Sequence, residues 1–240
     1  MRNGRSERTC IPDGGNESNA LSTLESAQSY ITASATTGEE GNGGRSTFKE
    51  SFAALLNWGE ATSLIHPEAE YSFLQRKPDG HGNEHEAWFH EDSNRWYKAT
   101  YPNRFGLAWG RIGSATAGEY LTRLTLQNRY FGDDIHLVAL VNCNEKLRVI
   151  TSQPHIFGER APYEEIQRWL CDLEFLRFIS NDCVAWYRDS DNLLVSDAHE
   201  GNVIRSKTGA LFAIDLNLMK PSQEMRETIT SLLEISKSVI

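Results

Sequence analysis

Apolar and polar positions recur with two different periods along this chain. A helical period predicts helices at residues 47–65, 114–130, 161–173 and 223–238. Shorter apolar stretches predict strands at residues 71–74, 86–89, 96–99, 135–142, 147–151, 184–188, 203–205 and 211–214. Two hairpins are predicted among them, one of residues 86–89 with 96–99 and one of residues 135–142 with 147–151. The order of these elements indicates an α+β fold, with a first half rich in strands and a mostly helical second half.

The same pattern divides the chain into three parts. Residues 1–45 are rich in Gly, Ser, Thr, Asn and Glu and contain few large apolar side chains. Such a segment buries too little surface to offset its chain entropy, so we expect a flexible polar tail, with a short helix around residues 21–31 as the alternative. Residues 46–155 are expected to form a helix and a β-rich lobe. The sequence Ser152-Gln153-Pro154 is expected to break its last strand, and residues 156–240 to form a smaller lobe.

Composition narrows the class of protein. No stretch approaches the roughly 20 apolar residues of a membrane span, and we expect neither a signal peptide nor a membrane partner. The net charge of −9 argues against non-specific nucleic-acid binding, which needs clustered Lys and Arg. The four cysteines (Cys10, Cys143, Cys171 and Cys183) are scattered, as expected of reduced thiols. We therefore expect a cytoplasmic protein.

The first candidate for chemistry is Asp197 in the sequence Asp-Ala-His-Glu-Gly-Asn. It follows an apolar stretch and precedes a polar turn, so it is predicted to lie on a loop at the end of a strand. A carboxylate there is suited to act as a general base. Asn202, five residues later, could brace Asp197 with its amide nitrogen while its oxygen faces a metal. The alternative is a structural Asx turn.

The second candidate is Asp215, an acid within the apolar sequence Ala-Ile-Asp-Leu. Burying an unpaired carboxylate is costly, so a cation or several donors should lie nearby. A hairpin over residues 203–214 would bring Asn202 and Asp215 together at its open end. Two oxygen ligands suit Mg²⁺. A capping or turn Asp is the alternative.

These motifs resemble the catalytic loop and metal-binding Asp of the protein-kinase-like superfamily. Within it, the chain most resembles the kinase domain of bacterial and phage polyvalent proteins, over about residues 70–220. The resemblance implies a bilobal kinase-like fold, with an antiparallel sheet in the first lobe and a minimal, mostly helical second lobe. It also implies a phosphotransferase that uses ATP and Mg²⁺ on a hydroxyl acceptor, either a protein or a small molecule. It implies that Asp197 is the catalytic base and that Asn202 and Asp215 hold the metal.

The resemblance also implies phosphate-binding residues in the first lobe. A strand lysine should contact the α- and β-phosphates and be held by a helical glutamate, and Lys98 and Glu119 fit these positions. A surface lysine and a surface acid favoured by the helix dipole are the alternatives. Gly80 and Gly82 would form the loop over the phosphates, although they could equally be a simple turn. Gln153 would lie at the hinge that contacts adenine.

Three departures from the kinase pattern support a second interpretation. Val195 and Ser196 replace the usual His and Arg, and the usual Asp-Phe-Gly is Asp215-Leu216-Asn217. Only 25 residues follow Asp215, from which we expect a minimal substrate-binding half. The alternative function is a catalytically weak, pseudokinase-type module that binds a nucleotide or a partner.

Overall fold

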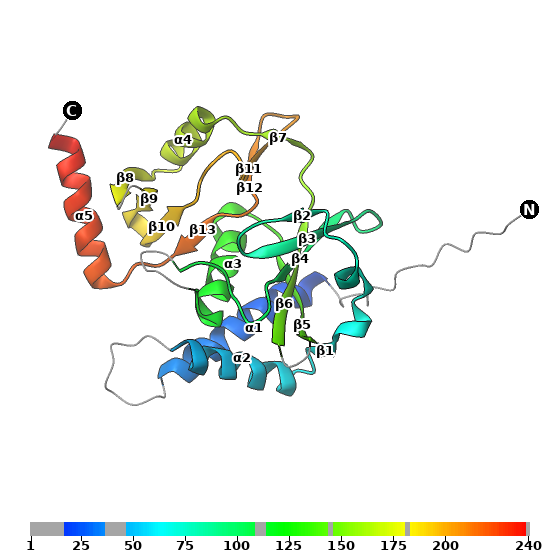
Figure 1. The fold of residues 1–240 in the computed structure, drawn as a ribbon. Coiled ribbons are helices and arrows are strands. Elements are labelled where there is room, and N and C mark those ends of the chain that lie inside the picture. Colours follow the sequence, from blue (N-terminus) through cyan, green and yellow to red (C-terminus); the bar gives the residue numbers. More distant parts are fainter. Residues whose placement is uncertain (1–16, 37–46, 109–113, 144–145, 181–182, 239–240) are drawn as a thin grey trace, which may run out of the picture. The chain divides into compact units, whose positions relative to one another are not determined.

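The computed structural model describes residues 17–36, 47–108, 114–143, 146–180 and 183–238 (Figure 1). The chain divides into two compact units, of which the first comprises Met1–Leu121 and Ile135–Pro154. The second comprises Thr122–Asp134 and His155–Ile240. The sequence-based division between residues 155 and 156 lies one residue after the end of the first unit. It did not anticipate that residues 122–134 group with the second.

Part of the expected flexible tail is a helix, α1 (Glu17–Thr36). Leu24, Ala27 and Ile31 lie on one face of α1 and are almost fully buried. This helix contacts both helix α2 (Phe48–Ala61) and strand β5 (His136–Cys143). Three apolar residues are too few to predict from composition that the segment is buried. They are buried here because α2 and β5 cover them. The remaining residues of the expected tail lie outside the part that the structure describes.

Helix α2 (Phe48–Ala61) confirms the helix predicted at residues 47–65, although it ends earlier. Thr47 begins it with a capping box: the Glu50 amide donates to Thr47 Oγ1 at 3.3 Å, and the Thr47 amide donates to Glu50 Oε2 at 2.8 Å. Leu55 and Trp58 are buried, whereas Phe48 is on the exposed side. The chain leaves the helix at Ser63, which has φ +56°.

A six-stranded sheet forms the centre of the first unit, in the order β1-β5-β6-β4-β3-β2. Its strands are β1 (Ile65–Pro67), β2 (Gly80–His81), β3 (His85–His90), β4 (Arg95–Thr100), β5 (His136–Cys143) and β6 (Lys146–Pro154). The two predicted hairpins, β3–β4 and β5–β6, are confirmed. The sheet was expected to be antiparallel throughout, but β1 pairs with β5 in parallel.

Two local predictions in this unit are wrong. The strand predicted at residues 71–74 is a 3₁₀ turn (Ser72–Gln75), preceded by another at Glu68–Glu70. Tyr71 and Phe73 are buried with the alternation of a strand, and their rings meet edge to face. The backbone nevertheless forms 3₁₀ turns, because the Leu74 and Arg76 amides donate to carbonyl oxygens three residues earlier.

The second wrong prediction is the break at residues 152–154. Strand β6 continues to Pro154, which pairs with Arg95 of β4. Proline is tolerated here because the pairing of β6 with β5 extends only as far as Ser152, so that Pro154 has a neighbouring strand on one side alone. Gln153 is consequently a sheet residue, and its side chain is buried.

The second unit is not mostly helical, because its described part contains seven strands. Four of them form an antiparallel sheet in the order β13-β10-β9-β8, and three form another in the order β12-β11-β7. Their bounds are β7 (Gly158–Arg160), β8 (Leu176–Ser180), β9 (Cys183–Arg188), β10 (Leu193–Ser196), β11 (Val203–Ser206), β12 (Leu211–Ala213) and β13 (Asn217–Met219). Of these, β7, β8 and β13 were not predicted.

Helices and sheets of this unit share one hydrophobic core. Helix α4 (Tyr163–Asp172) contributes Ile166 and Leu170, and α3 (Ala117–Phe131) contributes Leu126. Strands β10 and β11 contribute Val195 and Val203, so the residues on either side of the Asp197–Asn202 loop are anchored in this core. Helix α3 is continuous across the division, with residues 117–121 in the first unit and the rest in the second.

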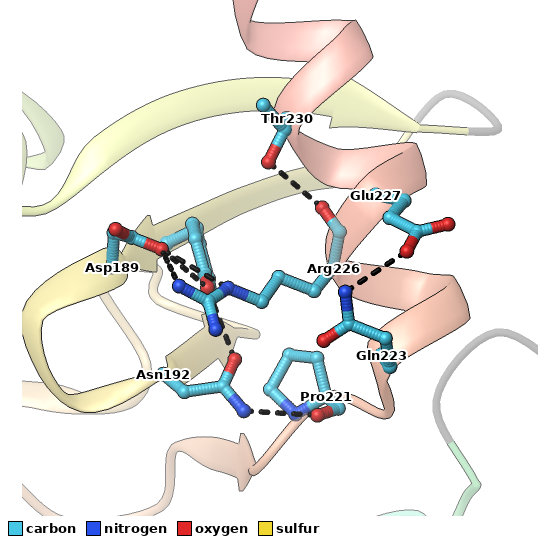
Figure 2. A network of polar contacts seen from close by, with 8 residues as sticks. Asp189, Asn192, Pro221, Gln223, Arg226, Glu227 and Thr230 are labelled. Carbon is cyan, nitrogen blue, oxygen red and sulfur yellow. Dashed lines mark hydrogen bonds and ion pairs between the residues drawn. The ribbon is translucent and has the colours of Figure 1, made fainter.

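Helix α5 (Gln223–Ser238), as predicted, closes the described chain, and it is attached to the turn that follows β9 (Figure 2). Arg226 Nη2 donates to Asp189 Oδ1 at 2.8 Å, and Asn192 Nδ2 donates to the Pro221 carbonyl at 3.0 Å. Ile229 is buried on the face of α5 that contacts β8. The segment after Asp215 thus runs through β13 into a helix anchored at its first turn.

Two expectations from composition concern the whole chain. Among the described residues, no helix combines the length and apolar character needed to cross a membrane. Cys171 and Cys183 are free thiols on the surface. Cys10 and the side chain of Cys143 lie outside the described part.

Candidate active site

Asp197 follows β10 directly, at the strand-end position predicted from the sequence. All four residues of β10 are buried, which fixes the backbone up to Ser196. Asp197 has φ +61°, a left-handed conformation that Asp and Asn tolerate better than other residues with a side chain. The His199 amide donates to the Asp197 carbonyl at 3.1 Å and closes the turn. The chain therefore changes direction at Asp197, whose side chain is 60% exposed.

Asn202 braces this turn with its side-chain amide, as the sequence predicted. Its Nδ2 atom donates to the Asp197 carbonyl at 2.9 Å and to Asp197 Oδ2 at 2.9 Å. The Asn202 backbone amide donates to the His199 carbonyl, also at 2.9 Å. Because oxygen and nitrogen occupy opposite branches of the amide, Asn202 Oδ1 points away from the Asp197 carboxylate and can accept a cation.

His199 is a second neighbour of Asp197 to which the sequence analysis assigned no role. Its Nδ1 atom accepts a hydrogen bond from the Gly201 amide at 2.9 Å, so in the neutral ring the proton is on Nε2. Nε2 lies 3.4 Å from Asp197 Oδ1. A Cβ atom on Gly201 would lie 2.7 Å from His199 Cε1, so glycine leaves room for the ring. The signal was present in the motif, as an imidazole two residues from the candidate base.

The predicted hairpin joins the second acid to this loop. Strands β11 and β12 pair antiparallel with Val203 opposite Ala213, and the Ile214 amide donates to the Asn202 carbonyl at 2.9 Å. Asn202 and Asp215 therefore lie at the same open end of the hairpin. Asp215 is half-buried, less enclosed than its apolar neighbours suggested.

The backbone around Asp215 is held by a residue far away in the sequence, Gln127 of α3. The Leu216 amide donates to Gln127 Oε1 at 3.2 Å, and Gln127 Nε2 lies 3.5 Å from the Ala213 carbonyl oxygen. Gln127 Nε2 also donates to Asp133 Oδ2 at 2.7 Å. Sequence reasoning missed Gln127, because nothing in a single helix-compatible glutamine indicates a partner 89 residues later.

The donor set fits a hard divalent cation. Asn202 Oδ1 and the Asp215 carboxylate offer two protein oxygens, and a Mg²⁺ site completes its shell with phosphate oxygens and water. Within the described ranges, no group of three or more His, Cys, Asp and Glu side chains could hold a metal by itself.

The residues predicted in the first lobe lie in the first unit. Lys98 is on β4, an interior strand, opposite Ala87 of β3 and Thr151 of β6. Glu119 forms a capping box with Thr116: Glu119 Oε2 accepts from the Thr116 amide at 2.7 Å, and the Glu119 amide donates to Thr116 Oγ1 at 3.2 Å. This contact gives Glu119 a structural role in beginning α3. Its pairing with Lys98 stays a prediction.

Gly80 and Gly82 occupy the start of the β2–β3 hairpin. Gly80 pairs with Ala87, and the Gly82 amide donates to the His85 carbonyl at 2.9 Å. A Cβ atom added at either glycine would meet nothing within 4 Å. The fold itself therefore does not require glycine at these positions, and their side-chain positions are open to a ligand.

Comparison with known proteins gives one match. The family model described as "Serine/Threonine/Tyrosine Kinase found in polyvalent proteins" matches residues 49–219, which include every candidate site residue above. No curated protein and no solved structure matches the chain.

Proposed function

Because the chain belongs to the family of serine/threonine/tyrosine kinases found in polyvalent proteins, we propose that it transfers the γ-phosphoryl group of ATP to a hydroxyl group, with Mg²⁺ as cofactor. The family description favours a protein side chain as the acceptor. The observation that carries this proposal is the connection of Asp197, Asn202 and Asp215 through one braced loop and one hairpin. Phosphoryl transfer needs a carboxylate for the hydroxyl and two oxygen ligands for the metal.

Asp197 acts as the general base in this proposal. Its carboxylate is largely exposed, so an acceptor hydroxyl can approach it. Asn202 Nδ2 fixes Oδ2 of the carboxylate, and His199 Nε2 faces Oδ1. These contacts orient the carboxylate toward an approaching hydroxyl, and a general base must be held within hydrogen-bond reach of the proton that it accepts.

Asn202 Oδ1 and Asp215 would hold Mg²⁺ together with the phosphates. When bound, the cation would balance the negative charge of the phosphoryl oxygens. Lys98 would contact the α- and β-phosphates with Glu119 as its orienting partner, and Gly80 and Gly82 would allow backbone approach to the phosphates. The buried β6 residue Gln153 would mark the adenine end of the site through its backbone. We further propose that the two units are the two lobes of a kinase-like fold.

A thermal-shift titration tests nucleotide binding, and transfer of a labelled γ-phosphate tests turnover. We expect ATP to raise the unfolding temperature only when Mg²⁺ is present, and label to appear on an added protein acceptor or on the chain itself. A shift without transfer would instead identify the pseudokinase-type module. Absence of both a shift and transfer, in a folded sample, would refute the proposed function.

A further inference from the structure

Gln127 is the buried polar residue that connects α3 to the Asp215 segment. Its side chain is 1% exposed and belongs to the second unit, as do all three of its partners. Its amide oxygen accepts from the Leu216 amide at 3.2 Å, and its nitrogen faces the Ala213 carbonyl at 3.5 Å. The side-chain amide thus bonds the chain on both sides of residues 214–215, in the way that a neighbouring strand would.

Asp133 fixes which way the Gln127 amide points. Asp133 Oδ2 accepts from Gln127 Nε2 at 2.7 Å, while Asp133 Oδ1 accepts from the Asp134 amide at 2.8 Å. A carboxylate only accepts hydrogen bonds, so the nitrogen of Gln127 must face it. The oxygen is then turned to the Leu216 amide. The orientation of Gln127 is therefore determined by its surroundings.

Breaking this arrangement is costly, because the groups involved are buried. Leu216 is 1% exposed, so its amide has no ready access to water if Gln127 is removed. A buried donor without an acceptor loses its hydration without compensation. Leu216 therefore remains against α3, and the carboxylate one residue earlier is confined to a narrow range of positions.

We propose that Gln127 is a positioning residue for Asp215, because its contacts determine the position of this carboxylate at the metal site. This inference rests on the proposed function, since it assigns Asp215 to the metal. Gln127 touches no reacting atom in it. It acts through the Leu216 amide and the Ala213 carbonyl, on either side of residues 214–215. The outer-shell partners of metal ligands act in the same manner, and their loss typically weakens metal affinity by about 10–100-fold.

Three variants test the proposal. Gln127→Met has a similar volume and removes both hydrogen-bonding ends. Gln127→Glu keeps an acceptor for Leu216 but places a second carboxylate against Asp133. The double variant Gln127→Glu/Asp133→Asn exchanges donor and acceptor between the two residues. Of the three Gln127 contacts described above, it loses the 3.5 Å contact with Ala213.

Ser51→Ala is the matched control. Ser51 Oγ accepts from the Gly118 amide at 2.8 Å, and Ser51 is 1% exposed. Its removal also leaves a backbone amide of α3 without its acceptor, but this amide belongs to the first unit, whereas Asp215 belongs to the second. The two variants are compared at equal loss of unfolding free energy. A change in Mg²⁺ dependence that Gln127→Met shows and Ser51→Ala does not is then an effect on Asp215 and not general destabilisation.

Two measurements are made on each variant. Hydrogen exchange at the Leu216 amide, in the protein without nucleotide, reports the contact itself. The Mg²⁺ concentration that half-saturates the ATP-induced thermal shift reports the metal site. We expect Gln127→Met to exchange about fivefold faster at Leu216 and to need about tenfold more Mg²⁺. Ser51→Ala should match the wild type in exchange at Leu216 and in Mg²⁺ dependence. The double variant should recover most of the Mg²⁺ affinity that Gln127→Glu loses.

Each outcome decides the proposal. Faster exchange at Leu216 with unchanged Mg²⁺ dependence would make Gln127 a structural residue only and overturn its positioning role. Unchanged exchange would overturn the contact. If Gln127→Met does not fold, failure of the double variant to recover Mg²⁺ affinity relative to Gln127→Glu overturns the proposal. If wild-type protein shows no Mg²⁺-dependent shift, the proposed function fails, and the role of Gln127 toward the metal fails with it. The exchange data then still show whether the contact exists.

Discussion

The two carboxylates of the candidate site are held in position in opposite ways. Asp197 is exposed, and the partners described for its side chain, His199 and Asn202, come from the next five residues of the same loop. Asp215 is half-buried, and the chain around it is fixed by Gln127, which lies almost 90 residues earlier on a helix. One acid thus depends on a self-contained turn, whereas the other depends on the packing of the whole second unit.

Because of this difference, we expect turnover and stability to respond differently to substitutions at the two acids. A residue on a self-braced surface loop can change without disturbing the core, so its substitution should affect turnover alone. The segment of Asp215 is part of the core, because Leu216 and the β12 residue Ala213 are both buried. Changes near Asp215 should therefore alter binding and stability together, unless they are confined to the carboxylate.

Replacing the base should have the largest effect. Asp197→Asn preserves the left-handed turn, which Asn also tolerates, and keeps an oxygen for Asn202 Nδ2. We expect phosphoryl transfer to fall by about 10²–10⁴-fold, as is typical for a lost general base, with ATP affinity within a few-fold of wild type. Single-turnover transfer and a binding titration measure the two quantities. Joint loss of ATP binding and of fold stability would show that Asp197 is a structural turn residue.

The next effect is expected from Asp215→Asn, which removes a metal ligand charge but keeps the shape. Wild-type protein with nucleotide at 100 times its Kd should gain about 2.7 kcal/mol of stability from binding. The Mg²⁺-dependent part of this gain should vanish in the variant, while the nucleotide-free unfolding temperature changes little. Asp172→Asn, an equal charge change on the exposed end of α4, is the control. Unchanged affinity for ATP with Mg²⁺ would refute the metal assignment.

Sequence reasoning succeeded where the contacts are local. The Asp197 turn, its bracing by Asn202 and the β11–β12 hairpin all involve short separations, and turn and hairpin chemistry is readable at that range. Gln127 could not be recognised, since its role arises only when α3 and the Asp215 segment pack together. The same limit explains Glu119: its capping box with Thr116 is local, whereas a pairing with Lys98 is not decided by spacing.

The fold shows the same division between local and distant information. Hairpin β3–β4 and helix α5 agree with the patterns that predicted them. Strand β1, by contrast, joins the sheet through its parallel pairing with β5, which comes much later in the sequence. The burial of α1 likewise depends on α2 and β5, which cover its short apolar stripe. Strand β8 is an exception, because it was missed although it pairs with the next strand along the chain, β9.

Weakening the local brace should have a smaller effect than removing either acid. In Gly201→Ala, the added methyl must displace the His199 ring, which can move because it is 55% exposed. We expect transfer to fall by only a few-fold, since one orienting contact of 3.4 Å is lost, and the unfolding temperature to stay near the wild-type value. His199→Ala should behave alike, and the double variant should add nothing further. If transfer falls as far as in Asp197→Asn, the Asp197 loop is far less self-contained than its His199 and Asn202 contacts indicate.

The smallest effect is expected at the exposed anchor of α5, which follows the Asp215 segment along the chain. Hydrogen bonds from Arg226 and then Tyr187 hold the pKa of Asp189 below its ordinary value. A carboxyl whose pKa is lower in the folded state stabilises the protein above its unfolded pKa and loses that contribution as the pH falls through the folded pKa.

Arg226→Ala should therefore lower the unfolding temperature slightly at pH 7, and the difference from wild type should shrink from about pH 4 downward. Arg226→Lys, which keeps the charge, should retain part of the contribution. Asp189→Ala combined with Arg226→Ala should cost no more than Asp189→Ala alone, because that change already removes the contact with Arg226 together with the one from Tyr187. If the difference between Arg226→Ala and wild type is independent of pH, Arg226 stabilises α5 by packing and not through Asp189. The hold on the Asp215 segment would then come from the buried side of the unit alone.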